Sequence, residues 1–194
     1  MSAPAETLAT PRHAYRPSLL PVGMVLFLGS ELMFFGALFG MYFTLRGQAR
    51  VWPPAGIHLE LRNPAIFTAI LLASSGTMRM AVRRIKAGDR RGMVRWLWLS
   101  LILGGAFLVG QGIDYRRLDF HVATNVYGSA FYTMTGFHAF HVFAGLVLML
   151  VILGRAAAGA YSARDHAGLE AVSYYWHFVD VVWLALFTTL FLIR

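Results

Sequence analysis

Long apolar stretches, separated by short polar and charged segments, organise the chain of 194 residues. A helix needs about 20 predominantly apolar residues to cross the hydrocarbon core of a bilayer. The pattern predicts five such helices, at residues 22–45, 65–82, 96–113, 127–153 and 171–193. The loops between them are too short to form a second domain. We therefore expect a single transmembrane domain over residues 22–194, preceded by an N-terminal tail of residues 1–21.

The composition supports an integral membrane protein of the all-α class. Hydrophobic residues make up 58% of the chain and charged residues 13%, whereas about 25% of an ordinary soluble domain is charged. The chain has no cysteine. This excludes a disulfide scaffold, a thiolate metal site and a cysteine nucleophile.

The positive charges lie between the apolar stretches, which is typical of topology signals and not of a nucleic-acid-binding surface. The formal net charge is +8, and we expect no nucleic-acid partner. Ten Lys or Arg residues fall on the side of the membrane that holds the N-terminus, and six fall on the other side. The positive-inside rule then places the N-terminus in the cytoplasm and the C-terminus outside.

Small and polar residues within the stretches predict close contacts between helices. Gly36 and Gly40 form a small-xxx-small motif in the first stretch, and residues 104–105 are both glycine. Such positions let helix backbones approach closely in a membrane. The second stretch is the weakest of the five, because it carries hydroxyl side chains at residues 74–77 and a cation at Arg79.

Five ionisable residues lie inside the predicted spans: Glu31, His138, His141, His177 and Asp180. Such residues are costly in a bilayer, and each is a functional candidate. From a rise of about 1.5 Å per residue, Glu31, His138 and Asp180 are expected at one depth, with the other two histidines about one turn deeper. This predicts a polar layer that draws on the first, fourth and fifth helices.

Several interpretations of this layer stay open: a metal or haem site, a proton or ion pathway, a hydrogen-bonded network that fixes helix packing, or a binding site for a lipid headgroup or gas. Di-iron bundles use Glu-x-x-His motifs, whereas this chain has His-x-x-His. A membrane enzyme would need a nucleophile and a base at one depth. Ser129 lies two turns or more from His138, so that pair does not supply them.

Three long motifs, in order, resemble subunit III of the haem–copper respiratory oxidases in its short five-helix bacterial form. They are FLGSELMFF at 27–35, YGSAFY with GFHAFHV at 127–142, and YYWHFVDVVW at 174–183. WPP at 52–54, GDR at 88–90 and Gln111 fit the same pattern. The likeness runs from about residue 21 to the end of the chain.

The resemblance implies a V-shaped helical bundle whose cleft holds phospholipid, with Glu31 on that cleft. It implies a non-catalytic subunit of a proton-pumping cytochrome c oxidase that stabilises subunit I and supports proton uptake. No cofactor is then expected on this chain, since haem and copper belong to partner subunits I and II. The expected location is the bacterial plasma membrane, as a multi-pass protein, and a cytochrome bc-type supercomplex is a further partner that the resemblance allows.

The resemblance also gives lipid-headgroup candidates, because HAGLE at 166–170 matches a motif that precedes the last helix of the family. These candidates are Arg164, His166 and Glu170. Two departures stand out: the first two helices of longer members are absent, and Asp114 stands where Glu is usual. The first departure implies a cleft that is more open or is filled by another subunit. The alternatives are a component of a quinol oxidase or nitric oxide reductase and, less favoured, a small proton or ion transporter.

Overall fold

Five α-helices account for most of the computed structural model, which describes residues 19–57 and 59–193. They are α1 (Leu19–Gln48), α2 (Arg62–Lys86), α3 (Arg90–Tyr115), α4 (Val126–Ala157) and α5 (Ala167–Phe187), which a π-helical segment, η1 (Thr188–Leu192), extends. The described residues contain no β-strand. All five helices are long and apolar enough to cross a membrane. The predicted all-α membrane protein with five spanning helices is confirmed.

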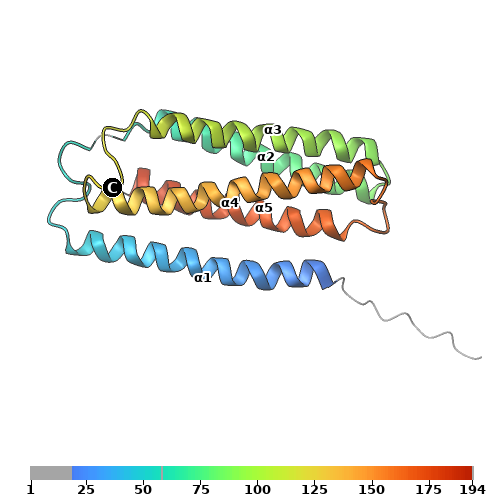
Figure 1. Ribbon diagram of the computed structural model, residues 1–194, viewed down its shortest axis with the longest axis horizontal. Coiled ribbons are helices and arrows are strands. Elements are labelled where there is room, and N and C mark those ends of the chain that lie inside the picture. The colour runs from blue at the N-terminus through green and yellow to red at the C-terminus, as the bar shows by residue number, and fades with distance from the viewer. Residues whose placement is uncertain (1–18, 58, 194) are drawn as a thin grey trace, which may run out of the picture.

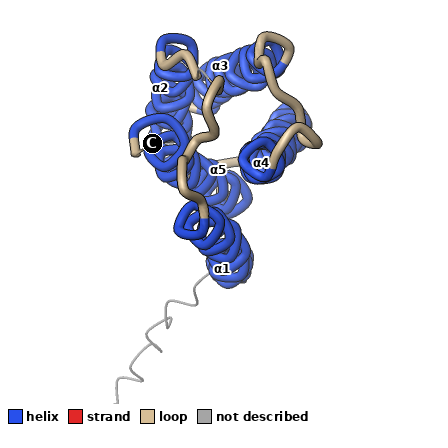
Figure 2. Tube along the Cα trace, turned by 90° about the vertical axis from the view of Figure 1, so that its left-hand side faces the viewer, coloured by secondary structure: helices blue, strands red, loops and turns tan. Residues whose placement is uncertain are grey.

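The helices lie side by side along the long axis of the molecule (Figure 1). Figure 2 shows α2, α3, α4 and α5 arranged as a ring, with α1 outside it. The α2–α3 hairpin forms the most extensive contact between helices, and α1 packs mainly on α5 and more lightly on α4. Most of α1 therefore remains open to whatever surrounds the chain.

The first four helices are longer than the apolar stretches that predicted them, and so is the fifth when η1 is counted with α5. The second helix continues to Lys86 and the third begins at Arg90. Charged residues therefore occupy helical turns at the end of the molecule that holds the α2–α3 turn. Backbone hydrogen bonding does not stop at the hydrocarbon boundary, and long Arg and Lys side chains reach the headgroup region. The first helix begins at Leu19, within the predicted tail, and residues 1–18 lie outside the described part of the chain.

Local hydrogen bonds fix where two of the helices begin. The Asp89 carboxylate accepts from the Gly92 backbone N–H at 2.7 Å, and the Asn125 side chain accepts from Gly128 N–H at 2.7 Å. These are N-caps, which satisfy backbone donors that a helix leaves unpaired at its start. Gly88, with φ of 80°, makes the tight turn that joins α2 to α3.

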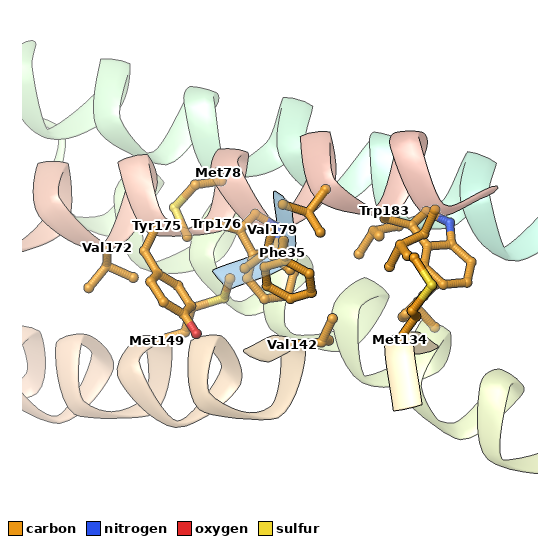
Figure 3. Close-up of a cluster of buried hydrophobic side chains, with 14 of the residues drawn as sticks. Phe35, Met78, Met134, Val142, Met149, Val172, Tyr175, Trp176, Val179 and Trp183 are labelled. Atoms are coloured by element: carbon orange, nitrogen blue, oxygen red, sulfur yellow. The ribbon is translucent and has the colours of Figure 1, made fainter. Parts of the chain in front are cut away.

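The core of the ring is built around Trp176 of α5, which is fully buried (Figure 3). A Cβ placed on Gly104 of α3 or on Gly145 of α4 would lie 2.7 Å from the Trp176 ring. The close approach predicted at Gly104 is thus present. A Cβ at Gly36 or Gly40 would meet nothing within 4 Å, so that motif packs against no other described part of the chain.

Candidate functional site

A glutamate and a histidine from two helices meet beside α1. The Glu31 Oε2 atom lies 3.0 Å from Nε2 of His141 on α4. The other ring nitrogen, Nδ1, lies 2.7 Å from the Phe137 carbonyl oxygen, which can only accept a hydrogen bond. Nδ1 therefore carries a proton, and the Glu31–His141 contact holds one more, either on the carboxyl or on the imidazole. Tyr175 of α5 donates to the His141 carbonyl at 3.0 Å and fixes this turn of α4.

The pair lies in a groove between α1 and α4, which we call the α1–α4 groove, with a volume of about 790 Å³. Most of its walls are aromatic or aliphatic. They include Phe27, Phe34, Phe137, Phe140, Phe143 and Val147. The side chains of Glu31 and His141 are only 20% and 10% exposed. A hydrogen-bonded acid–base pair thus lies at the base of an otherwise apolar groove.

A second polar group lies on the other side of α5, against α2. His177 Nδ1 is 2.5 Å from the Ser75 hydroxyl oxygen and 4.0 Å from Oδ2 of Asp180. Asp180 is 3% exposed, and the His177 side chain is 28% exposed. The two residues are three apart on one helix and share a face, as the sequence predicted.

His138 belongs to neither group. It is fully buried, its ring stacks on Trp183 with centroids 4.9 Å apart, and Phe107 contacts it edge-on at 5.9 Å. Neither ring nitrogen hydrogen-bonds to a described residue.

The five predicted residues therefore do not form one connected layer. Depth alone paired Glu31 with His138, but the structure pairs Glu31 with His141, one turn away. The two histidines are three residues apart, so they project about 60° apart around α4. One side chain faces α1 while the other faces the aromatic interior of the ring. Among the described residues, no group of three or more His, Asp or Glu is placed to hold a metal ion.

The hydroxyl groups of α2 are the interhelical contacts that sequence reasoning missed. Trp183 donates its indole N–H to the Thr68 hydroxyl at 2.8 Å, and Trp176 donates to the Ser74 hydroxyl at 3.0 Å. Together with Ser75, these residues make α2 the hydrogen-bonding partner of α5. The sequence did contain a sign of this polar face, because residues 68 and 75 lie seven apart and share a helix face. The hydroxyl side chains were interpreted only as a weakness of the second apolar stretch.

At the end of the molecule that holds the α2–α3 turn, two of the three lipid-headgroup candidates come together. Glu170 Oε1 lies 2.6 Å from Lys86 Nζ and 3.4 Å from His166 Nε2. Arg164 is exposed in the preceding loop. Lys86 was not among the lipid-headgroup candidates predicted from the sequence. It is the last residue of α2 and lies beside the first turn of α5. Contact of these residues with lipid stays a prediction.

The opposite end of the ring contains a polar cluster around Gln111. Gln111 donates to the Tyr115 hydroxyl at 3.2 Å, and Tyr115 donates to the Thr135 hydroxyl at 2.6 Å. Asn63 of α2 lies 3.4 Å from the Asp114 carboxylate, so the shorter acid at this position still has a partner. These residues line a cavity of about 320 Å³ between the helices.

Comparison with known proteins gives one consistent family. A family model described as cytochrome c oxidase subunit III matches residues 10–193. The chain is 43% identical over 183 residues to a cytochrome c oxidase subunit 3 of Thermostichus vulcanus, covering 93% of this chain and 91% of that protein. It is 40% identical to a cytochrome c oxidase subunit 3 of Corynebacterium diphtheriae, covering 100% of this chain and 96% of the relative. A probable cytochrome c oxidase subunit 3 of Mycobacterium leprae is 44% identical, with 92% and 90% covered.

Proposed function

Since the chain belongs to the cytochrome c oxidase subunit III family, we propose that it is the non-catalytic subunit of its oxidase complex. In this proposal it stabilises subunit I, holds phospholipid in the α1–α4 groove and supports proton uptake. Haem and copper reside on subunits I and II, and cytochrome c is the electron donor. The location is the bacterial plasma membrane, with the N-terminus in the cytoplasm. A cytochrome bc-type supercomplex is the wider assembly.

The α1–α4 groove is the observation that carries the proposal. Its aromatic walls face the surroundings of the chain, and in a bilayer those surroundings are acyl chains. A lipid chain in the groove would shield the apolar surface and also exclude water from Glu31 and His141. The groove therefore suits a bound phospholipid better than it suits an aqueous ion pathway.

The Glu31–His141 pair supports a role near proton transfer. The Phe137 carbonyl fixes the proton on Nδ1 of His141, so the bond between Nε2 and Glu31 Oε2 holds one exchangeable proton. The pair can carry that proton as a glutamic acid or as an imidazolium without moving a heavy atom.

The Lys86–Glu170–His166 group, with Arg164 nearby, is our candidate for a lipid headgroup contact. Cationic side chains make short charge-assisted hydrogen bonds to phosphate oxygens. The end of the molecule that holds the α2–α3 turn would then bind the headgroup of a lipid. This contact is separate from the α1–α4 groove and is tested separately, by an Arg164→Gln variant.

Affinity purification of the tagged chain from mildly solubilised native membranes tests the proposal. We expect a-type haem and copper in the eluate, with oxygen uptake from reduced cytochrome c. Haem of the b or o type without the copper centre of subunit II would point to the quinol oxidase or nitric oxide reductase relatives. A colourless chain that moves protons across reconstituted vesicles would contradict the supporting role.

A Glu31→Gln variant tests the groove itself. We expect the complex to assemble with normal haem and copper content, and its initial turnover to be close to that of the wild type. Activity should then decay several-fold faster during sustained turnover, because the exchangeable proton is lost. Glu60→Gln, a carboxyl outside this groove, is the matched control. Equal decay of the two variants would remove the role assigned to Glu31.

A further inference from the structure

A second groove lies between the start of α3 and the end of α4. Its volume is about 990 Å³. The α3 wall carries Arg91, Arg95 and Trp98, and the α4 wall carries Leu150 and Gly154. None of these residues belongs to the site described above. We call this hollow the α3–α4 groove.

The α3 wall is ordered by polarity along the helix. Arg91, Arg95 and Trp98 stand four and then three residues apart, so they form one stripe on one face. Ile102 continues the stripe and is 62% exposed. From the helix end inward, the order is two cations, an indole and an aliphatic side chain. This is the order of headgroup, interface and hydrocarbon in a bilayer leaflet.

The charges that line the groove are positive overall. Asp89, its one acidic lining residue, already accepts from Gly92 N–H at 2.7 Å and lies 3.5 Å from Arg84. Arg90 donates to the carbonyl groups of Ala156 and Ala157 at the end of α4 and so closes the end of the groove. Arg91 and Arg95 remain exposed on the groove wall, without a described anionic partner.

The α4 wall has a gap where an acyl chain could lie. Gly154 has no side chain, and a Cβ at this position would meet nothing within 4 Å. Leu150 lies one turn farther along α4 and is 49% exposed. A trough thus continues from the arginines toward the middle of the helix, between Trp98 and the aliphatic surface of α4.

We propose that the α3–α4 groove binds one anionic glycerophospholipid. The phosphate lies against Arg91 and Arg95, and an acyl chain follows the trough between Trp98 and Gly154. Charge complementarity favours this occupant, because each arginine near the interface attracts an anionic lipid and a zwitterionic one much less. The inference depends only on the chain lying in a bilayer, and it holds whichever electron donor the complex uses.

Native mass spectrometry of the purified complex, delipidated in detergent and titrated with single lipids, tests the site. The probes are palmitoyl-oleoyl phosphatidylglycerol and phosphatidylcholine of the same chain length. We expect phosphatidylglycerol to bind to the wild type more tightly than phosphatidylcholine. The double variant Arg91→Gln/Arg95→Gln should lose about five-fold in affinity per arginine.

The matched control is Arg116→Gln/Arg117→Gln, which removes the same charge just beyond the other end of α3. It should retain the wild-type affinity. Equal loss in the two double variants, or no loss in the first, would overturn the site. A complex that binds the two lipids equally tightly would also overturn the site.

A second variant tests the trough without changing charge. Gly154→Leu fills the acyl path, and it should weaken phosphatidylglycerol binding while the complex assembles normally. Gly136→Leu, at another α4 glycine that has nothing within 4 Å, should leave lipid binding unchanged. If benzoylphenylalanine placed at position 98 cross-links in native membranes to a protein chain and not to lipid, the groove is a subunit interface and the proposal fails.

Discussion

The nitrogen atoms of α5 side chains find their partners among the hydroxyl groups of α2. Trp183 donates to Thr68, Trp176 donates to Ser74, and His177 contacts Ser75. Each contact joins two helices at a point that water does not reach easily. Hydrogen bonds between membrane helices contribute about 0.6 kcal/mol on average and up to about 1.7 kcal/mol.

Replacing Trp183 by phenylalanine isolates one of these bonds. The variant keeps an aromatic ring beside His138 but loses the indole donor, while the Thr68 hydroxyl still donates to the Pro64 carbonyl. We expect the free energy of unfolding of the complex-bound chain to fall by about 1 kcal/mol. Thermal denaturation of the purified complex measures it. Trp96→Phe, which removes no described interhelical hydrogen bond, should change the midpoint less.

His138 is a packing residue in this structure, and two variants separate packing from chemistry. His138→Ala removes a ring stacked at 4.9 Å on Trp183, and we expect a loss of about 3 kcal/mol. His138→Phe keeps a ring of similar shape and should retain most of the stability. Complex yield should follow this order, with initial turnover per assembled complex unchanged. Normal yield with abolished turnover in both variants would show that His138 acts in the chemistry.

At the scale of helices, α5 is the element on which the others pack. Trp176 lies where α3 and α4 each present a glycine, and its indole reaches α2. Four helices therefore meet at one side chain. The first helix is attached differently, through the Glu31–His141 pair near its middle and through Tyr42, whose hydroxyl donates to the Thr189 carbonyl of η1 at 3.5 Å.

Two neighbouring glycines of α3 provide a controlled test of this packing. Gly104→Ala places a methyl group 2.7 Å from the Trp176 ring, whereas a Cβ at Gly105 meets nothing within 4 Å. Overpacking of this kind costs about 1–3 kcal/mol. We expect Gly104→Ala to lower the thermal midpoint and the yield of the complex. Gly105→Ala should be neutral, and similar losses from both would show that helix propensity matters here and contact with Trp176 does not.

At the scale of the whole molecule, many large hydrophobic side chains are exposed, and α1 lies outside the ring, beside α5 (Figure 2). This surface needs lipid or a partner subunit on nearly every side. More of the Lys and Arg residues lie at one end than at the other, and there α2, α3 and α4 carry Arg83, Arg91 and Arg155. That end should face the cytoplasm.

Because the chain has no cysteine, its orientation can be mapped with single introduced thiols. Ala163→Cys, in the α4–α5 loop, should react with a membrane-impermeant maleimide only after the cytoplasmic face is opened. Ala123→Cys, in the α3–α4 loop, should react in intact cells. Both positions are exposed and both substitutions are small. The reverse labelling pattern would invert the topology that the charges predict.

The sequence determined the class of protein, the five helices, the family and the residues worth examining. Apolar length and charge distribution are local properties, so they can be read along the chain. The ends of the helices were less predictable, because α2 continues to Lys86 and α3 begins at Arg90 in segments that are no longer apolar. Hydropathy reports where hydrocarbon ends, and helical hydrogen bonding continues beyond that point.

Only the tertiary structure decided which ionisable groups meet. Glu31 contacts His141 and not His138 because the rotation of α4 about its axis, set by packing against α1 and α5, turns one histidine toward each side. The same packing gave the hydroxyls of α2 their partners on α5. Depth along a helix follows from counting residues, but rotation and neighbours follow from the fit of all the side chains together, which no single stretch of sequence contains.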